Sequence, residues 1–286
     1  MKNTSFSSEN TDNQLSKKSR SLCDNTMSVA ILSGKGGVGK TNLALNIARM
    51  LYLKNEPALL MDCDLGLANI DVLLGLHAQH NLHDVISNQI EAHEAIVPIE
   101  ENGFDFIPAA SGLPELIQLD EDSIALLFSQ LDSCLPNYRY LFMDLGAGIS
   151  STVLSFASIA HARIIVITPE PTSITDGYAV MKVLNAQHGI TDFHILINQV
   201  SNRQEYELAS RRLCEATSHF LGFTPKIIGF VQQDQAVLDA VIEQTPFTRK
   251  NPQSPASKNV IEIAEQIRRL RTSLANQIKN GPILTI

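Results

Sequence analysis

Short apolar runs alternate along this chain with longer segments in which apolar residues recur at helical spacing. The first run, VAILS at 29–33, ends at a glycine-rich loop, and in the segment after it Leu43, Ile47 and Leu51 fall on one face of a helix. Runs that are apolar on both faces and separated by helices predict an α/β fold, with a mostly parallel central sheet covered by helices on both faces. The later runs are ALLMD, FDFIPA, RYLFMD, RIIVIT, FHILINQV and KIIGFV, and helical patterns lie near 120–134, 150–161, 173–188, 203–221, 234–244 and 258–278.

The ends of the chain set the expected domain limits. Residues 1–26 are mostly Ser, Asn, Thr and charged residues, which cannot bury enough apolar surface to offset the loss of conformational entropy on ordering. We therefore predict a mobile N-terminal tail at 1–26, a single three-layer domain at 27–271 and a C-terminal amphipathic extension at 272–286. The tail lacks the apolar centre of a signal peptide, and no apolar run is long enough to span a bilayer, so we expect a cytoplasmic protein.

The bulk composition narrows the function classes. The chain has 286 residues, of which 44% are hydrophobic, and this is enough for a full core. Its net charge of −8 disfavours a general surface for nucleic acid. The four cysteines are scattered without a CxxC pair, so reduced thiols are a simpler interpretation than a zinc ribbon, a CxxC redox centre or a disulfide framework. They are Cys23, Cys63, Cys134 and Cys214.

The glycine-rich loop fits the phosphate-binding pattern GxxxxGK[ST]. In such a loop, successive backbone N–H groups and the N-terminus of the following helix meet the negative charge of phosphates. The pattern places Lys40 at the β and γ oxygens and the Thr41 hydroxyl on Mg²⁺, and the chain supplies the strand before and the helix after that the motif needs. A glycine-rich structural turn is the alternative. The loop consists of Gly34, Lys35, Gly36, Gly37, Val38, Gly39, Lys40 and Thr41.

Three aspartates lie at the ends of apolar runs, where a parallel sheet places its ligand crevice. Asp144 ends YLFMD and is followed by glycines suited to a γ-phosphate sensor, as in a Walker B strand. Asp62 and Asp64 point to one face if their strand continues, and a bound cation offsets the repulsion between them. We expect Asp62 and Asp144 to serve the metal and Asp64 to orient a water; helix caps and solvated strand-end acids are the alternatives.

Lys35, the second lysine of the loop, points to a family. GKGGVGKT resembles the deviant Walker A motif of the MinD/ParA (SIMIBI-class) ATPases, and the resemblance extends over nearly all of 29–270. In that family two ATP-bound subunits face each other, and this lysine touches the phosphates in the partner's site. The resemblance implies a P-loop NTPase domain, ATP and Mg²⁺ as cofactors, and a homodimer that forms with ATP. It also implies slow, regulatory ATP hydrolysis in which Lys35 acts in trans, as an arginine finger does. A solvated loop lysine is the alternative.

The same resemblance assigns the other site residues. Lys40 and Asp64 match the phosphate-loop lysine and the water-positioning aspartate, and Asp144 matches the Walker B aspartate, with Asp62 as a strand-end companion of Asp64. Asn198 in LINQV matches the residue that reads adenine, and the aspartate of a guanine-reading NKxD motif is absent after it. The residues expected to bind nucleotide are therefore the whole loop from Gly34 to Thr41 together with Asn42, Asn198 and Asp234, the last of these at the end of the segment 229–234.

Within the family, several segments resemble the branch of flagellar-number regulators, FlhG/FleN (YlxH). They are GKTNLALNIA, DLGLANIDVLLGL, DLGAGIS and TPEPTSITDGYAVMK. Members of this branch limit the number and placement of flagella through an FlhF-type GTPase, flagellar switch-complex proteins and, in some species, a flagellar transcriptional activator. The N-terminal tail only loosely matches the DQAxxLR-type segment that stimulates FlhF, with Asp12, Gln14 and Leu15 as its remains.

The last helical pattern leaves two interpretations open. A basic amphipathic end suits the surface of an anionic membrane, and family members contact membranes reversibly. The other interpretation is a closing helix packed on the sheet, which we favour as far as Leu270. The apolar stripe consists of Val260, Ala264, Ile267, Leu270, Leu274 and Ile278, and it is flanked by Arg268, Arg269, Arg271 and Lys279.

Other activities of the same superfamily compete with this interpretation. A partition or cell-division ATPase of the ParA/MinD type is the main alternative. A ParA-type motor needs a basic patch for DNA, for which the chain offers only SRRL and RRLR, so we expect no direct contact with nucleic acid. An iron–sulfur carrier would need bridging cysteines near the switch loops, and none follows Asp144 closely.

Overall fold

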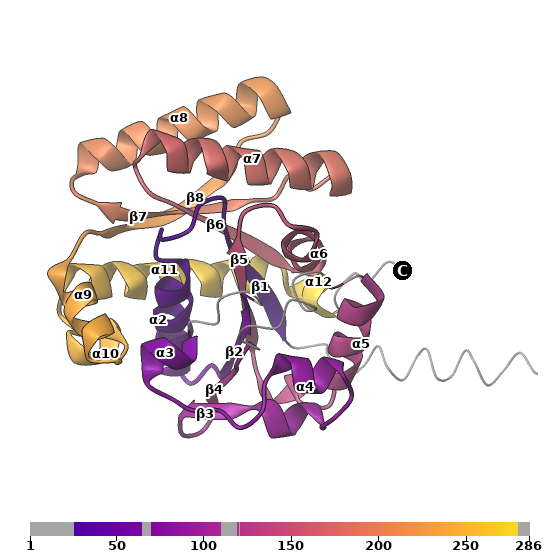
Figure 1. Cartoon of the computed structure of the whole chain (residues 1–286). Coiled ribbons are helices and arrows are strands. Elements are labelled where there is room, and N and C mark those ends of the chain that lie inside the picture. The colour runs from indigo at the N-terminus through magenta and orange to yellow at the C-terminus, as the bar shows by residue number, and fades with distance from the viewer. Residues whose placement is uncertain (1–25, 65–69, 110–118, 120, 280–286) are drawn as a thin grey trace, which may run out of the picture.

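The computed structural model describes residues 26–64, 70–109, 119 and 121–279. In this part of the chain, an eight-stranded sheet runs in the order β3-β4-β2-β5-β1-β6-β7-β8, with helices on both faces (Figure 1). Every neighbouring pair of strands is parallel except β3 and β4, so the predicted α/β fold is confirmed. The strands are β1 (Met27–Ser33), β2 (Ala58–Cys63), β3 (Val97–Glu100), β4 (Phe104–Ile107), β5 (Tyr140–Ala147), β6 (Ala162–Ile167), β7 (His194–Val200) and β8 (Lys226–Gln232).

The helices divide between the two faces of the sheet, as their shared hydrophobic clusters show. One face carries α2 (Lys40–Tyr52), α3 (Ile70–Leu74), α9 (Gln235–Ile242), α10 (Phe247–Lys250), α11 (Pro255–Ser273) and α12 (Ala275–Lys279). The other carries α4 (Leu82–Ile86), α5 (Glu121–Leu131), α6 (Ser151–Ile159), α7 (Pro171–His188) and α8 (Arg203–Leu221). Short 3₁₀ turns lie at η1 (Ala92–Ala95) and η3 (Leu135–Asn137).

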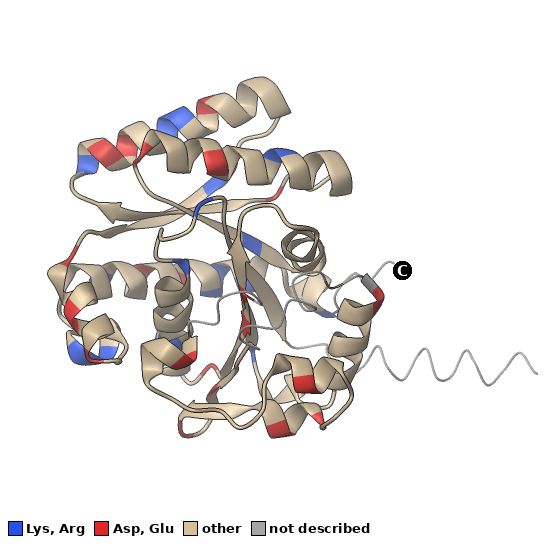
Figure 2. Ribbon diagram, in the orientation of Figure 1, with Lys and Arg blue, Asp and Glu red and all other residues tan. Residues whose placement is uncertain are grey.

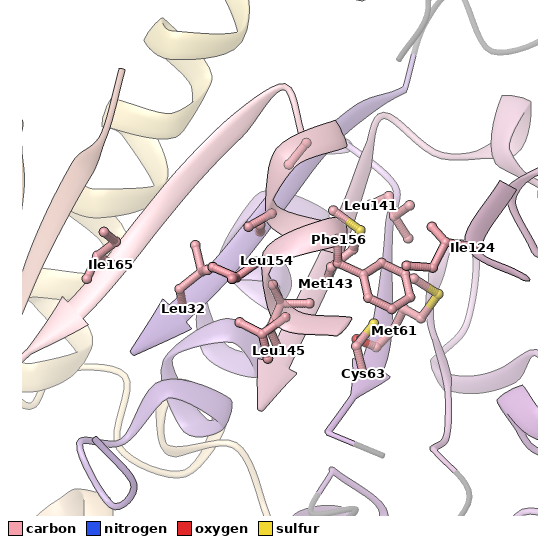
Figure 3. Close-up of a cluster of buried hydrophobic side chains, with 14 of the residues drawn as sticks. Leu32, Met61, Cys63, Ile124, Leu141, Met143, Leu145, Leu154, Phe156 and Ile165 are labelled. Atoms are coloured by element: carbon pink, nitrogen blue, oxygen red, sulfur yellow. The ribbon is translucent and has the colours of Figure 1, made fainter. Parts of the chain in front are cut away.

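Side chains alternate between the two faces along each strand, and this alternation decides which face each functional residue joins. In β1, Val29 and Ile31 belong to the core on the α2 side, whereas Ala30 and Leu32 belong to the opposite core. Figure 3 shows the opposite core, where Leu32 lies among side chains of β5 and α6. In β2 and β5 the parity is reversed, since Leu60 and Phe142 belong to the core on the α2 side. An even-numbered residue further along β2 or β5 therefore projects to the α2 side, beside the phosphate loop.

Two parts of the fold differ from the sequence-based expectation. The edge strand β3 was not predicted, because VPIE contains a proline and a glutamate and is too short to show a pattern. The last helical pattern does not form one helix, since α11 ends at Ser273 and α12 begins at Ala275. We expected core packing only as far as Leu270, but Leu274 and Ile278 are also buried, in the core on the α2 side.

Neither end of the chain is described in full by the structure. The predicted tail at 1–26 and its Asp12, Gln14 and Leu15 lie almost wholly outside the described residues, as does the part of the C-terminal extension after Lys279. Among the described residues, no helix is both long enough and apolar enough to cross a membrane.

Candidate functional site

The phosphate loop joins the end of β1 to the start of α2, at the carboxyl edge of the sheet (Figure 1). Gly37 and Gly39 have positive φ angles of 79° and 86°, a conformation that is costly for residues with a Cβ. Gly39 is the N-cap of α2 and offers no side chain to its first turn, which also contains no acidic residue. The first N–H groups of α2 and the helix dipole are therefore left to meet an anion.

Two glycines of the loop are required by close packing. A Cβ on Gly39 would lie 2.4 Å from Nδ2 of Asn198, and one on Gly34 would lie 2.3 Å from the backbone oxygen of Asp176 in α7. By contrast, a Cβ on Gly36 or Gly37 would meet nothing within 4 Å. The ends of the loop are thus fixed against β7 and α7, while its middle faces open space that a phosphate group can enter.

Lys40 and Asp144 form a buried ion pair across the base of the loop. Lys40 Nζ lies 2.9 Å from Asp144 Oδ1, and both side chains are almost fully shielded from solvent. Burial raises the pKa of Asp144, while the positive charge of Lys40 and a polar contact with Thr41 act in the opposite direction. The structure thus brings together the loop lysine, the loop threonine and the carboxylate of Asp144, which lies in the second half of β5.

Asp62 and Asp64 lie next to this pair but take different positions. Asp62 is the register partner of Asp144 in the neighbouring strand, and its side chain accepts hydrogen bonds from the backbone N–H groups of Asp64 at 3.0 Å and Ile70 at 3.3 Å. Asp64 follows the end of β2, where its Oδ1 would lie 3.4 Å from a Cβ placed on Gly146. Asp64 therefore faces the glycine that follows Asp144 and Leu145 near the end of β5.

Cys63, between the two aspartates, takes no part in the site. It projects to the opposite core and is buried. Burial, followed by the negative charge of nearby aspartates, raises the pKa of its thiol well above the usual range. A protonated, inaccessible thiol is a poor nucleophile and a poor metal ligand.

The donor set around Asp144 fits a magnesium ion that shares its coordination with phosphates. Asp144 Oδ2 is buried and has no hydrogen-bond partner among the described residues, so one carboxylate oxygen is available. The described part of the chain contains no group of three or more His, Cys, Asp or Glu residues that could hold a metal by itself. Mg²⁺ in nucleotide sites is typically bound through one or two carboxylates, waters and substrate phosphates, so this sparse set suits it.

A cavity of about 400 Å³ lies beside the loop, between the ends of β7 and β8 and helices α9 and α10. Asn198 donates its amide N–H to the Val38 carbonyl at 2.8 Å, so a residue predicted to read the base is joined directly to the phosphate loop. Apolar side chains from α2, β8, α9 and α10 form the walls. The lining consists of Gly39, Asn42, Leu43, Asn198, Gln199, Val231, Gln232, Gln233, Asp234, Gln235, Val237, Leu238, Val241 and Phe247.

Asp234 lines this cavity, but its carboxylate is engaged in the fold. It is the N-cap of α9, where it accepts from the Ala236 N–H at 3.0 Å, and it also accepts from the Ala256 N–H at the start of α11 at 3.1 Å. Partial burial acts to raise its pKa, but these two backbone hydrogen bonds lower it overall. The side chain thus joins two helix N-termini.

Sequence reasoning missed several residues of the cavity. Gln199 adopts a positive φ of 57°, and its side chain donates to the Gly37 carbonyl at 3.5 Å. The residues after Asn198 exclude a guanine-reading motif, but nothing in the sequence marks Gln199 as a contact of the phosphate loop. The walls from α9 and α10 were also missed, because ordinary apolar residues of amphipathic helices carry no motif that marks them as ligand contacts.

Lys35 stands apart from the buried pair, on the exposed part of the loop. Its Nζ lies 2.6 Å from Oε2 of Glu170, the N-cap residue of α7. This contact could not be predicted from the sequence, because the two residues lie 135 positions apart. Because both side chains are largely solvent-exposed, the lysine is in a position where a second molecule can reach it.

A phosphate loop on a central strand, a lysine–aspartate pair at its base and a base-sized cavity beside it define a nucleotide-binding P-loop protein. Comparisons with known proteins agree. A family model described as an AAA domain matches residues 26–208. The chain belongs to the MinD/ParA family of P-loop ATPases.

Similar proteins lie in two parts of that family. The chain is 36% identical to the antiactivator FleN of Pseudomonas aeruginosa, with 84% of this chain and 85% of the relative covered. It is 31% identical to the flagellum site-determining protein YlxH of Helicobacter pylori, with 84% and 81% covered. Among solved structures, the MinC:MinD cell division complex of Aquifex aeolicus matches with a TM-score of 0.69 and 26% identity over 85% of this chain and 96% of that chain. Within the family, the chain is thus similar to flagellar regulators as well as to cell-division ATPases.

Proposed function

We propose that this chain is a Mg²⁺-dependent ATPase that dimerises when it binds ATP and in that form regulates the number and placement of flagella. The single observation that carries the mechanism is the separation of the two loop lysines. Lys40 is buried against Asp144, whereas Lys35 lies on the exposed side of the same loop. This separation supports a role for Lys40 at the phosphates of its own subunit and a role for Lys35 at the phosphates of a neighbouring subunit.

The residues around the phosphate loop divide between binding the phosphates and binding the metal. The N–H groups of the loop and the first turn of α2 hold the phosphates, and Lys40 exchanges Asp144 for phosphate oxygens. Thr41, Asp144 and, through its proximity, Asp62 hold the metal side of the site. The metal, when bound, neutralises charge that develops on the transferred phosphoryl group.

The base-reading residue favours adenine over guanine. One of the two N–H donors of the Asn198 amide is used by Val38, and we propose that the amide oxygen is the acceptor that reads the base. An oxygen acceptor complements the exocyclic amine of adenine, whereas it would oppose the carbonyl that guanine has at the same position. The predicted ATP specificity rests on this hydrogen-bond polarity.

Hydrolysis requires a positioned water and a cation near the γ-phosphate. Asp64, beside Gly146, orients the water in this mechanism, since its carboxylate accepts the protons that point away from the phosphorus. Lys35 supplies its charge only when a second subunit closes over the loop, which couples turnover to assembly.

The cellular role rests on the similarity to FleN and YlxH rather than on the site. We propose that the ATP-bound dimer acts through an FlhF-type GTPase, flagellar switch-complex proteins and, in some species, a flagellar transcriptional activator. We also propose that the protein is cytoplasmic, that its ATPase domain spans 27–271, and that the protein contacts the inner face of the cell membrane reversibly. The alternative, positioning of division sites or of DNA, is supported by the similarity to MinD proteins.

The decisive experiment is size-exclusion chromatography with light scattering in ADP, in ATP, and in ATP with the Asp64→Ala variant. We expect a monomer in ADP, a transient dimer in ATP, and a stable dimer for the variant. A monomer at high concentration with bound, intact ATP would overturn the mechanism. In cells, replacing the gene by its Lys40→Ala variant should change flagellar number; a change in septum placement alone would support the alternative.

A further inference from the structure

A pocket lined by arginines lies at the opposite edge of the sheet from the nucleotide site. Its volume is about 280 Å³, and its lining comes from the start of β5, the turn before β2 and the end of α11. Tyr140, in the lining, is the first residue of β5, whereas Asp144 is near its carboxyl end, about 13 Å further along the strand. The residues of this arginine pocket are Glu56, Arg139, Tyr140, Glu265, Arg268, Arg269, Arg271 and Thr272.

The lining has more positive than negative charge, although the chain as a whole carries −8. Two carboxylates, Glu56 and Glu265, are both used by one arginine, Arg268, each at 3.1 Å. Glu56 also accepts a hydrogen bond from the Tyr140 hydroxyl, and Glu265 is shared with Lys54. In the described part of the chain, neither Arg139 nor Arg269 forms an ion pair.

Arg271 shows that the cations are held close to one another. Its guanidinium lies over the Tyr140 ring, 5.8 Å from the ring centroid. Burial lowers its pKa, and the positive charge of Arg139 lowers it further. Tyr140 and the carboxylate of Glu56 act in the opposite direction, but Glu56 is also paired with Arg268. A further anion in the hollow would therefore lower the electrostatic cost of keeping two guanidinium groups near each other. Figure 2 shows that α11 carries several Lys or Arg positions.

We propose that this arginine pocket, with Arg139, Arg269 and Arg271 as its cationic walls, binds a phosphate-type oxyanion. Guanidinium groups present N–H donors in a planar fork that matches the oxygens of phosphate, and charge-assisted hydrogen bonds of this kind are stronger than neutral ones. A free phosphate compound and the headgroup of an anionic lipid both present such an oxyanion, and the test below distinguishes them. The site is separate from the nucleotide loop and does not depend on the proposed ATPase mechanism.

The test uses the full chain loaded with Mg²⁺ and ADP, so that the nucleotide loop does not bind the probe. Inorganic phosphate is titrated at low salt while the arginine Nε–Hε signals are followed by NMR. We expect these signals to shift with saturation, and the dissociation constant to rise at least about fivefold in the Arg139→Gln/Arg269→Gln variant. Arg139 and Arg269 are both exposed, so the double variant should unfold at the same temperature as the wild-type protein. That measurement checks that the variant is folded.

The matched control is Arg211→Gln/Arg212→Gln, which removes the same charge from exposed positions of α8. In a second arm, sedimentation with vesicles of phosphatidylcholine, with and without phosphatidylglycerol, is compared for the three proteins. Binding of free phosphate that only the pocket variant loses supports a soluble ligand, and the same pattern with phosphatidylglycerol supports a lipid headgroup. Absence of binding in both arms, or equal losses in the pocket and control variants, would overturn the proposal.

Discussion

Replacing Lys35 by alanine separates its contribution to folding from its contribution to catalysis. In the monomer the only ion pair of Lys35 is with Glu170, among the described residues, and the two side chains are 43% and 59% exposed. Pairs this exposed contribute about 0–1 kcal/mol, so the unfolding free energy should change by no more than that. Loss of a cation that stabilises the transition state raises the activation free energy by about 3 kcal/mol or more, so turnover should fall at least about a hundredfold. Phosphate release and urea unfolding measure the two effects.

Mixing two inactive variants then tests whether the lysine acts in trans. In a dimer of one Lys35→Ala subunit and one Asp64→Ala subunit, the first subunit keeps Asp64 and receives Lys35 from its partner. One of its two sites is then complete. Random pairing of equal amounts makes about half of the dimers mixed, so the mixture should recover about a quarter of wild-type activity.

The exposed Lys182 of α7 gives the control, because Lys182→Ala removes the same charge nearby and should leave turnover unchanged. No recovery of activity in a mixture that demonstrably contains mixed dimers would refute the trans mechanism. Wild-type turnover of Lys35→Ala by itself would refute any catalytic role for this lysine.

Three further predictions concern other parts of the molecule. Gly39→Ala would place a methyl group 2.4 Å from the Asn198 amide at a positive φ, so the affinity for a fluorescent ATP analogue should fall at least about tenfold; an unchanged affinity would contradict the packing argument. Burial and the charge of Arg163 lower the pKa of His161 to about 4, so between pH 6.5 and pH 4 the unfolded chain binds a proton at this residue that the folded chain does not bind. The free energy of unfolding should therefore fall by about 3 kcal/mol between these pH values. In urea unfolding, His161→Asn should make the free energy of unfolding depend less on pH over the same range. Ile278→Ala should lower the unfolding free energy by about 2–4 kcal/mol, whereas Lys279→Ala should not; equal effects would mean that Ile278 is not held in the core in solution.

The phosphate loop and the central strands could be predicted because their signals are local. The loop is a fixed pattern of glycines and lysines, and the strands are apolar on both faces, so neither depends on distant contacts. The same holds for the aspartate at the end of β5, whose position in a parallel sheet places it beside the loop.

The features of the fold and the site that could not be predicted depend on contacts between distant parts of the chain. The pairing of Lys35 with Glu170 joins residues that lie 135 positions apart, and Gln199 reaches the loop only because of an unusual backbone angle. The sequence places Asp234 at the end of a segment whose backbone is expected near the base, but it does not show that the carboxylate caps α9 and contacts the start of α11. Leu274 and Ile278 form an amphipathic pattern that suits a membrane or a core equally, and only the packed structure places them in the core.

The buried pair of Lys40 and Asp144 has a consequence for the order in which ligands are accepted. Each side chain is the counter-ion of the other, so a triphosphate that draws Lys40 away leaves a carboxylate uncompensated in a medium of low polarity. A divalent cation restores neutrality at that carboxylate. The affinities for nucleotide and cation are thereby linked, and by thermodynamic reciprocity each ligand strengthens the binding of the other by the same factor. The nucleotide-free protein is thus already arranged so that ATP without a divalent cation should bind more weakly than ATP with one.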